Sequence, residues 1–166
     1  NELPELPTVV LRASTAYGMA SRIRFDLLLH QFIYEAWEKK QISLYGANSW
    51  RPMVHVDDIA RAIVISLTKN EQISHKDVFN VGSNDQNFKK IQLAKMVAER
   101  LNVDIVESES KKDPRDYRVS FDKIVTELGF NTIHNPKESI EQIAASLENG
   151  LIDENVLHES VNIKSD

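Results

Sequence analysis

Apolar residues follow two alternating patterns along the chain, and these patterns predict its secondary structure. Short β-branched and apolar runs predict strands at residues 8–12, 42–45, 53–56, 78–81 and 103–106. Apolar residues at helical spacing predict helices at residues 26–40, 58–67, 87–101, 122–128 and 137–148. Because strands and helices alternate, we expect an α/β fold with a partly parallel sheet.

Polar residues at the expected helix starts are interpreted as helix caps. Asp26 and Asn87 are candidate N-caps, since their side-chain oxygens can accept bonds from the N–H groups of a first turn. Asp57 and Asp58 form a tempting acid pair, but adjacent residues at a helix start do not face each other across a substrate. We interpret them as an N-cap and a first-turn charge favoured by the helix dipole.

Composition limits the classes of protein to which the chain can belong. With 166 residues, 42% of them hydrophobic and 27% charged, it is long enough for one domain or for part of a larger one. Its 25 acidic and 20 basic side chains give a net charge of −5, unlike the basic balance of a generic nucleic-acid binder. No apolar run approaches the roughly 18 residues of a membrane span. We expect a cytoplasmic protein that binds neither nucleic acid nor a membrane.

Thiol and metal chemistry find little support in the sequence. There is no cysteine, which excludes a disulfide framework, a zinc–thiolate site and a cysteine nucleophile. The five histidines are scattered, and no spacing of His, Asp and Glu suggests a metal site, so none is predicted. His55 lies in the strand expected at residues 53–56, and we interpret it as a partly buried histidine whose hydrogen bonds are satisfied.

Two stretches, residues 11–18 and 44–62, resemble those of a known enzyme family. Three later pieces, at residues 79–82, 116–123 and 127–130, keep the order found in that family. Together they resemble the C-terminal half of an extended short-chain dehydrogenase/reductase of the NAD-dependent nucleotide-sugar epimerase/dehydratase family. The resemblance covers about residues 7–150.

The resemblance implies a fold and a division of the chain. Residues 1–150 would form the last part of a Rossmann-like sheet plus the small α/β substrate-binding domain, and residues 151–166 a polar C-terminal tail. The family's Gly-x-x-Gly-x-x-Gly turn is missing, because the five glycines are far apart, and none of the four tyrosines has a lysine four residues later. We therefore expect that the NAD-binding N-terminal half is absent and that this chain alone is inactive. The complete protein would be an NAD-dependent homodimer.

The resemblance also implies residues that bind a nucleotide-sugar substrate. Arg51 matches an arginine that grips the diphosphate, and Arg115 and Arg118 lie in the loop that supplies a second arginine, with the choice between them open. Tyr45 matches the aromatic residue that lies against the nucleotide base. Thr15 stands where the family commonly has an asparagine that bonds the phosphates; threonine is shorter and has no amide, which weakens the argument there.

Four further positions match contact residues of the family, and no residue of this chain is expected to be catalytic. Asp26 and Leu27 match the substrate-contacting start of a helix, and Ala13 and Ser14 match positions beside the nicotinamide. Two other functions stay open, a non-catalytic module that senses nucleotide sugars and a protein-interaction module with a relic groove. The sequence does not identify the reaction subtype, the sugar or the base.

Overall fold

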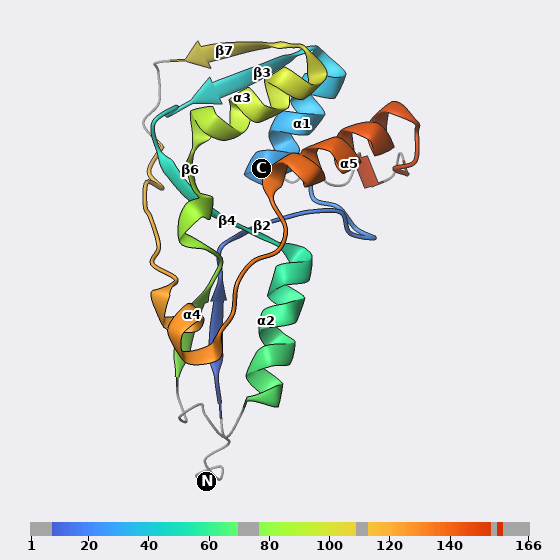
Figure 1. Ribbon diagram of the computed structural model, residues 1–166. Coiled ribbons are helices and arrows are strands. Elements are labelled where there is room, and N and C mark those ends of the chain that lie inside the picture. The colour runs from blue at the N-terminus through green and yellow to red at the C-terminus, as the bar shows by residue number, and fades with distance from the viewer. Residues whose placement is uncertain (1–7, 70–76, 109–112, 154–155, 158–166) are drawn as a thin grey trace, which may run out of the picture.

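The chain folds into alternating strands and helices, as the computed structural model in Figure 1 shows for residues 8–69, 77–108, 113–153 and 156–157. The strands are β1 (Val10–Ala13), β2 (Thr15–Tyr17), β3 (Gln41–Tyr45), β4 (Trp50–His55), β5 (Val78–Val81), β6 (Asn87–Lys89) and β7 (Asp104–Ser108). The helices are α1 (Leu28–Lys39), α2 (Val56–Thr68), α3 (Lys90–Leu101), α4 (Asp122–Leu128) and α5 (Pro136–Glu148), with a short 3₁₀ turn at Asn84–Gln86.

The strands of the described residues pair in three small sheets, which are mainly parallel. β1 pairs with β5 and β3 pairs with β7, both in parallel. In the third sheet β4 lies between β2, to which it is parallel, and β6, to which it is antiparallel. Each parallel pair is joined by a crossover that contains a helix, as α/β folds require. The expected α/β architecture with a partly parallel sheet is thus confirmed.

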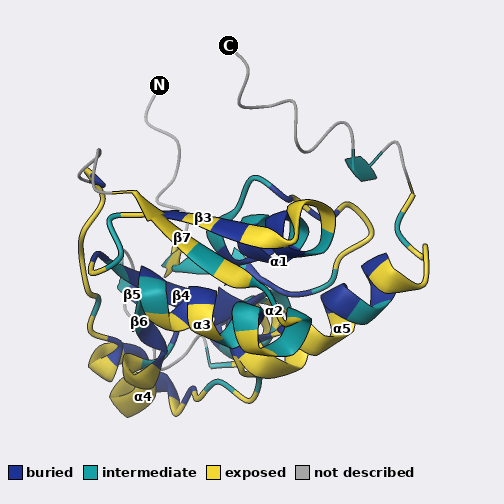
Figure 2. Cartoon of the chain, turned by 90° about the horizontal axis from the view of Figure 1, so that it is seen from above, coloured by how far each residue is buried: buried dark blue, intermediate teal, exposed yellow. Residues whose placement is uncertain are grey.

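Two hydrophobic cores hold these elements together. The larger core lies where α1, α3 and α5 meet one another and β3, and its residues include Leu29, Ile33, Ile42, Leu93 and Ile143. The smaller core joins β4, β5, α2 and α4, and its residues include Val54, Ala62, Phe79, Ile124 and Phe130. Figure 2 shows the helices of the larger core with dark buried faces, whereas β7 is mostly exposed.

A buried polar network connects the two cores. The Tyr17 hydroxyl donates to Gln86 Oε1 at 2.9 Å, and Gln86 Nε2 donates to the backbone oxygen of His134 at 2.8 Å. The fully buried carboxylate of Asp58 accepts the backbone N–H groups of Ile133, at 3.1 Å, and His134, at 3.2 Å. These bonds fix the segment that leads from the smaller core into α5.

The predicted cap at Asp26 is wrong. Helix α1 starts at Leu28, two residues later than expected, and its N-cap Leu27 has no side-chain capping bond. The Asp26 carboxylate instead accepts two hydrogen bonds from the guanidinium of Arg24, at 2.6 and 3.0 Å. A nearby arginine fork outcompetes the weaker backbone donors of the first turn for this carboxylate.

The predicted cap at Asn87 is also wrong. Residues 87–89 form strand β6, in which Asn87 pairs with Pro52, and α3 begins only at Lys90. The Asn87 side chain accepts a bond from the backbone N–H of Val119 and donates to its oxygen, both at 3.0 Å. It therefore holds a loop rather than a helix end.

At the start of α2 the first-turn charges are confirmed, but the cap is a different residue. Asp57 and Asp58 both lie in the first turn, while the N-cap is His55, whose Nδ1 accepts the backbone N–H of Asp57 at 3.1 Å. His55 is buried, as expected, and its ring fills this role.

The last two helices lie close to their expected positions, and the tail after them is described only in part. The helix expected at residues 122–128 is confirmed, and the last helix begins one residue earlier than expected, at Pro136. Of the expected tail, residues 154–155 and 158–166 lie outside the described part of the chain. None of the helices within the described ranges has the length and apolar character to cross a bilayer.

Candidate functional site

A pocket of about 320 Å³ collects most of the substrate residues expected from the sequence. It opens beside the start of α1, the first residue of β2, the last residue of β3, and the loop that follows residue 112. Six of the expected residues line it, namely Thr15, Asp26, Leu27, Tyr45, Arg51 and Arg115. Four cationic side chains line it as well, Arg24, Arg51, Lys90 and Arg115, against two carboxylates, Asp26 and Asp113. We call it the cationic pocket.

The Asp113 carboxylate lies at the centre of this pocket's charges. Its Oδ2 is 2.6 Å from Nη2 of Arg51 and 3.0 Å from Nζ of Lys90, and its Oδ1 accepts the backbone N–H of Arg115 at 3.0 Å. The Arg51, Lys90 and Asp113 side chains are at most 5% exposed. Within the described residues Nη2 of Arg51 is buried and meets Asp113 as an ion pair without the angle of a hydrogen bond.

These contacts shift the acid–base equilibria of the pocket. Burial alone raises the pKa of Asp113, but the backbone N–H of Arg115 and the cations of Lys90 and Arg51 outweigh it and lower that pKa below its usual value. Burial is the main cause that lowers the pKa of Lys90, and Arg51 and Arg115 add to this effect against the opposing Asp113. The pocket therefore favours the ionised carboxylate of Asp113 and disfavours the charged ammonium of Lys90, which has lost hydration.

Local structure explains how these side chains come together. In β3, buried and exposed residues alternate, so Tyr45 ends the strand on its exposed face. Gly46 then turns the chain with φ of 59°, and a Cβ there would lie 2.9 Å from the Cβ of Asp113. Glycine thus permits both the turn and the close approach of Asp113. The ammonium of Lys90 lies over the Tyr45 ring, 3.6 Å from its centroid.

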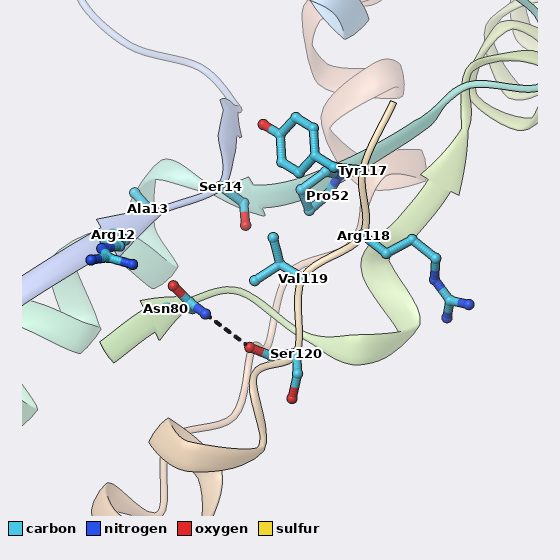
Figure 3. A pocket seen from close by; sticks show the side chains of 9 residues that line it. All are labelled: Arg12, Ala13, Ser14, Pro52, Asn80, Tyr117, Arg118, Val119 and Ser120. Atoms are coloured by element: carbon cyan, nitrogen blue, oxygen red, sulfur yellow. Dashed lines mark hydrogen bonds between the residues drawn. The ribbon is translucent and has the colours of Figure 1, made fainter. Parts of the chain in front are cut away.

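A second pocket, of about 450 Å³, holds the residues expected beside the cofactor. Ala13 and Ser14 line it at the end of β1, together with Asn80 from β5 and Arg118 (Figure 3). Arg118 extends away from Ser14 in this view, and its guanidinium lies 4.6 Å from the ring centroid of Trp50.

The structure thus separates the two arginines between which the sequence leaves a choice. Arg115 lines the cationic pocket with Arg51, whereas Arg118 lines the second pocket. The segment between them is anchored by Asp116, whose Oδ1 accepts the backbone N–H of Trp50 at 2.8 Å.

Sequence reasoning missed Lys90 and Asp113. Lys90 occupies a position of α3 that shares its buried face with Leu93, Ala94 and Val97, and a lysine at such spacing was a usable signal of a buried charge. Asp113 gave no such signal, because its partners lie far away in the sequence and the loop around it is polar throughout.

Three residues that could ligate a metal gather away from both pockets. His55, Asp57 and His134 bring their ligand atoms within 4.8 Å of one another. The two imidazole rings are stacked, with centroids 4.1 Å apart and planes at 27°. Lone pairs of imidazole nitrogens lie in the ring plane, so in stacked rings they run side by side instead of converging on one ion. The arrangement supports a ring stack and gives no reason to assign a metal.

Comparison with known proteins identifies relatives of this fold. Residues 1–82 match the family model described as NAD dependent epimerase/dehydratase family. Among solved structures, dTDP-glucose 4,6-dehydratase from Bacillus anthracis, in complex with NAD, superposes with a TM-score of 0.73 at 22% identity, over 91% of this chain and 48% of that one. RMD from Pseudomonas aeruginosa, complexed with NADPH, gives a TM-score of 0.72 at 18% identity, over 87% of this chain and 49% of that one.

A third relative carries a nucleotide sugar. UDP-glucuronic acid 4-epimerase from Bacillus cereus, in complex with UDP-glucuronic acid and NAD, gives a TM-score of 0.71 at 21% identity, over 87% of this chain and 46% of that one. The chain therefore spans about half the length of these proteins. At these identities the likeness confirms the fold alone, a Rossmann-like α/β fold as expected from the sequence.

Proposed function

We propose that this chain, whose residues 1–82 match the NAD dependent epimerase/dehydratase family, is the nucleotide-sugar-binding portion of such an enzyme. One observation carries the proposal. Six residues at positions that match substrate contacts of the family, drawn from four separate parts of the sequence, line a single pocket with an excess of cations. A diphosphate is the ligand group that such a pocket suits best, because it spreads negative charge over several acceptor oxygens.

In this proposal Arg51 and Arg115 bind the diphosphate. The guanidinium of Arg51 is fixed by its own strand, since Nη1 donates to the backbone oxygen of Trp50 at 2.7 Å, so its direction is set before a ligand arrives. Arg115 is 72% exposed and can move toward a ligand. Thr15 would donate a further hydrogen bond to the phosphates from the edge of β2.

The remaining residues of the pocket would hold the two ends of the substrate. The Tyr45 ring is 38% exposed and offers a flat apolar face to the nucleotide base. Asp26 and Leu27, just before α1, would contact the sugar. The Asp26 carboxylate is already oriented by Arg24, which is the arrangement expected of an acceptor for sugar hydroxyls.

The complete protein is proposed to use NAD as its cofactor, since the similar 4-epimerase and 4,6-dehydratase structures are complexes with NAD. When bound, NAD would supply reversible hydride transfer at a sugar carbon. Ala13 and Ser14 fit a place beside the nicotinamide, since they are small and lie at the carboxyl end of β1, where parallel sheets bind nucleotides. The Gly-rich turn and the tyrosine–lysine pair would come from an NAD-binding half outside this sequence.

Three parts of the proposal concern the whole protein. This chain alone is expected to be inactive, because no tyrosine in it has a lysine four residues later. Residues 1–150 would be the enzyme portion and residues 151–166 a polar tail. The complete enzyme would be a homodimer.

Titration calorimetry with a panel of UDP-, TDP-, GDP- and ADP-sugars tests the proposal. We expect one class to bind, and we expect Arg115→Gln to weaken that binding about tenfold, the loss of one charge-assisted hydrogen bond. Lys95→Gln is the matched control, since Lys95 is exposed on α3 and lies outside the pocket. Failure of every nucleotide sugar to bind would refute the proposal, and equal losses in both variants would refute the role of Arg115.

A further inference from the structure

Lys90 lies on the buried face of α3, at a position where an apolar side chain would be expected. It begins the buried stripe of α3, which continues through Leu93, Ala94 and Val97 into the larger core. Its own side chain is 2% exposed. Burial of an ammonium is unfavourable unless charges and hydrogen bonds compensate for the lost hydration. An apolar residue here would avoid that penalty altogether.

The compensation that Lys90 receives is incomplete. Within the described residues its Nζ has one hydrogen-bond acceptor, Asp113 Oδ2 at 3.0 Å, and one ring face, that of Tyr45. An ammonium has three N–H donors. The same carboxylate also faces Arg51 and Arg115, so three cations share one anion. The site therefore carries an excess of about two positive charges, and within the described residues the Lys90 ammonium has more N–H donors than hydrogen-bond acceptors.

We propose that Lys90 is a ligand-contacting cation of the cationic pocket and makes it select nucleoside diphosphates over nucleoside monophosphates. This inference rests on the proposed function. A diphosphate placed between Arg51 and Arg115 adds the negative charge that Asp113 alone does not supply. Because Lys90 lies beneath Tyr45, it meets the phosphate next to the stacked base. Asp113 holds the ammonium in that place when no ligand is bound.

The test compares matched pairs of ligands by titration calorimetry. The probes are UDP, TDP, GDP and ADP with their four monophosphates, measured on the wild-type chain and on Lys90→Met. Methionine suits the apolar stripe and favours helix, so we expect this variant to fold. We expect Lys90→Met to weaken the best diphosphate about tenfold and the matching monophosphate less than threefold. Lys90→Arg, which keeps the charge, should restore the preference.

Lys89→Met is the control for a general change in charge. Lys89 is the adjacent residue, its Nζ bonds Asn48 at 3.4 Å, and it is not among the residues that line the cationic pocket. We expect it to leave both affinities unchanged. A structural role for Lys90 would lower the melting temperature without altering the ratio of the two affinities, and that result would overturn the proposal.

A pH series on the wild-type chain gives a second readout that needs no variant to fold. The groups that face Lys90 are Tyr45 on β3, Arg51 on β4, and Asp113 and Arg115 on the loop. The preference for diphosphate should fall as alkaline pH deprotonates Lys90, and it should stay flat in Lys90→Arg. A flat wild-type profile would overturn the proposal. If the wild type binds no nucleoside diphosphate, this inference and the proposed function fail together, whereas binding that ignores Lys90 refutes this inference alone.

Discussion

The imidazole of His55 stacks on that of His134 across the junction between the two cores, with ring centroids 4.1 Å apart. His55 caps α2 through Nδ1, which accepts a backbone N–H and therefore has to be unprotonated. The stack thus joins the start of α2 to the segment that precedes α5, and it does so with a neutral ring.

The first prediction follows from this ring: the chain loses stability in mild acid. Burial, and next the nearby His134, lower the pKa of His55, and burial also lowers the pKa of His30. The attraction of Asp57, Asp58 and Glu138 only partly offsets this for His55. Because the folded state binds these protons less readily than the unfolded chain, stability is fully present above about pH 6.5 and falls as the pH drops below it.

Thermal melts between about pH 8 and about pH 5 check this prediction. Protonation of either ring disrupts its present bonds, since His30 Nε2 accepts the backbone N–H of Gly18 at 3.1 Å. His55→Asn, which retains a capping oxygen, should reduce the slope of melting temperature against pH. A melting temperature that stays level or rises below about pH 6 would refute the assignment.

A second prediction concerns Asp58, the carboxylate that fixes the segment before α5. It accepts bonds from two backbone N–H groups and from Arg61 Nη1 and is fully buried. We expect Asp58→Asn to lower the free energy of unfolding by about 2–3 kcal/mol, since an amide nitrogen then faces donors. Asp57→Asn is the control, because Asp57 is 68% exposed, and it should cost about 0.5 kcal/mol or less. Urea unfolding measures the loss in both variants, and equal losses would show that the buried bonds of Asp58 do not stabilise the segment before α5.

The elements of this fold are predictable from the sequence because their apolar spacing is local. Helix α4 ends before Gly129, which has a φ of 64°, and α5 has Pro136 in its first turn with Asn135 as its cap. Such signals involve neighbours in sequence. The starts of α1 and α3 were mispredicted because the expected caps bond elsewhere. Asp26 bonds a nearby guanidinium, and Asn87 bonds a loop that is distant in the sequence.

The candidate site divides in the same way. Arg51, Tyr45 and Thr15 could be singled out because motifs surround them, and they line one pocket. The apolar spacing of α3 was a signal for Lys90, but Asp113 had none, since its pairing with Lys90 joins a loop to a helix start 23 residues away. No local pattern encodes a contact of that kind, and it depends on the turn at Gly46 that brings the loop in.

A third prediction tests that turn through the close contact at Gly46. A Cβ there would lie 2.9 Å from Asp113, whereas a Cβ at Gly150 would meet nothing within 4 Å. Both glycines have a left-handed φ, of 59° and 64°, so alanine at either position costs about 1 kcal/mol in backbone strain. We expect Gly46→Ala to cost about 1–3 kcal/mol more than Gly150→Ala and to weaken nucleotide-sugar binding. Equal losses of unfolding free energy in the two variants would show that Asp113 moves aside at no cost in stability.

The last prediction concerns an apolar stripe on α2, defined here as Ile63, Val64 and Leu67. These residues are 47%, 58% and 71% exposed, and strand β1 pairs within the described residues with β5 alone. Exposed apolar stripes and open strand edges promote association. We therefore expect this chain to self-associate as its concentration rises, and we expect Leu67→Lys to reduce that association with little loss of stability, because the side chain is already mostly in water.

Sedimentation velocity over a range of concentrations measures the effect. Val125→Lys on α4 is the matched control, since Val125 is also an exposed apolar residue, at 38%, but lies outside the stripe. It should associate like the wild type. Association that persists in Leu67→Lys, or a wild-type chain that stays monomeric throughout, would show that the stripe does not drive contact between copies. A loss of association in both variants would assign the effect to added charge in general.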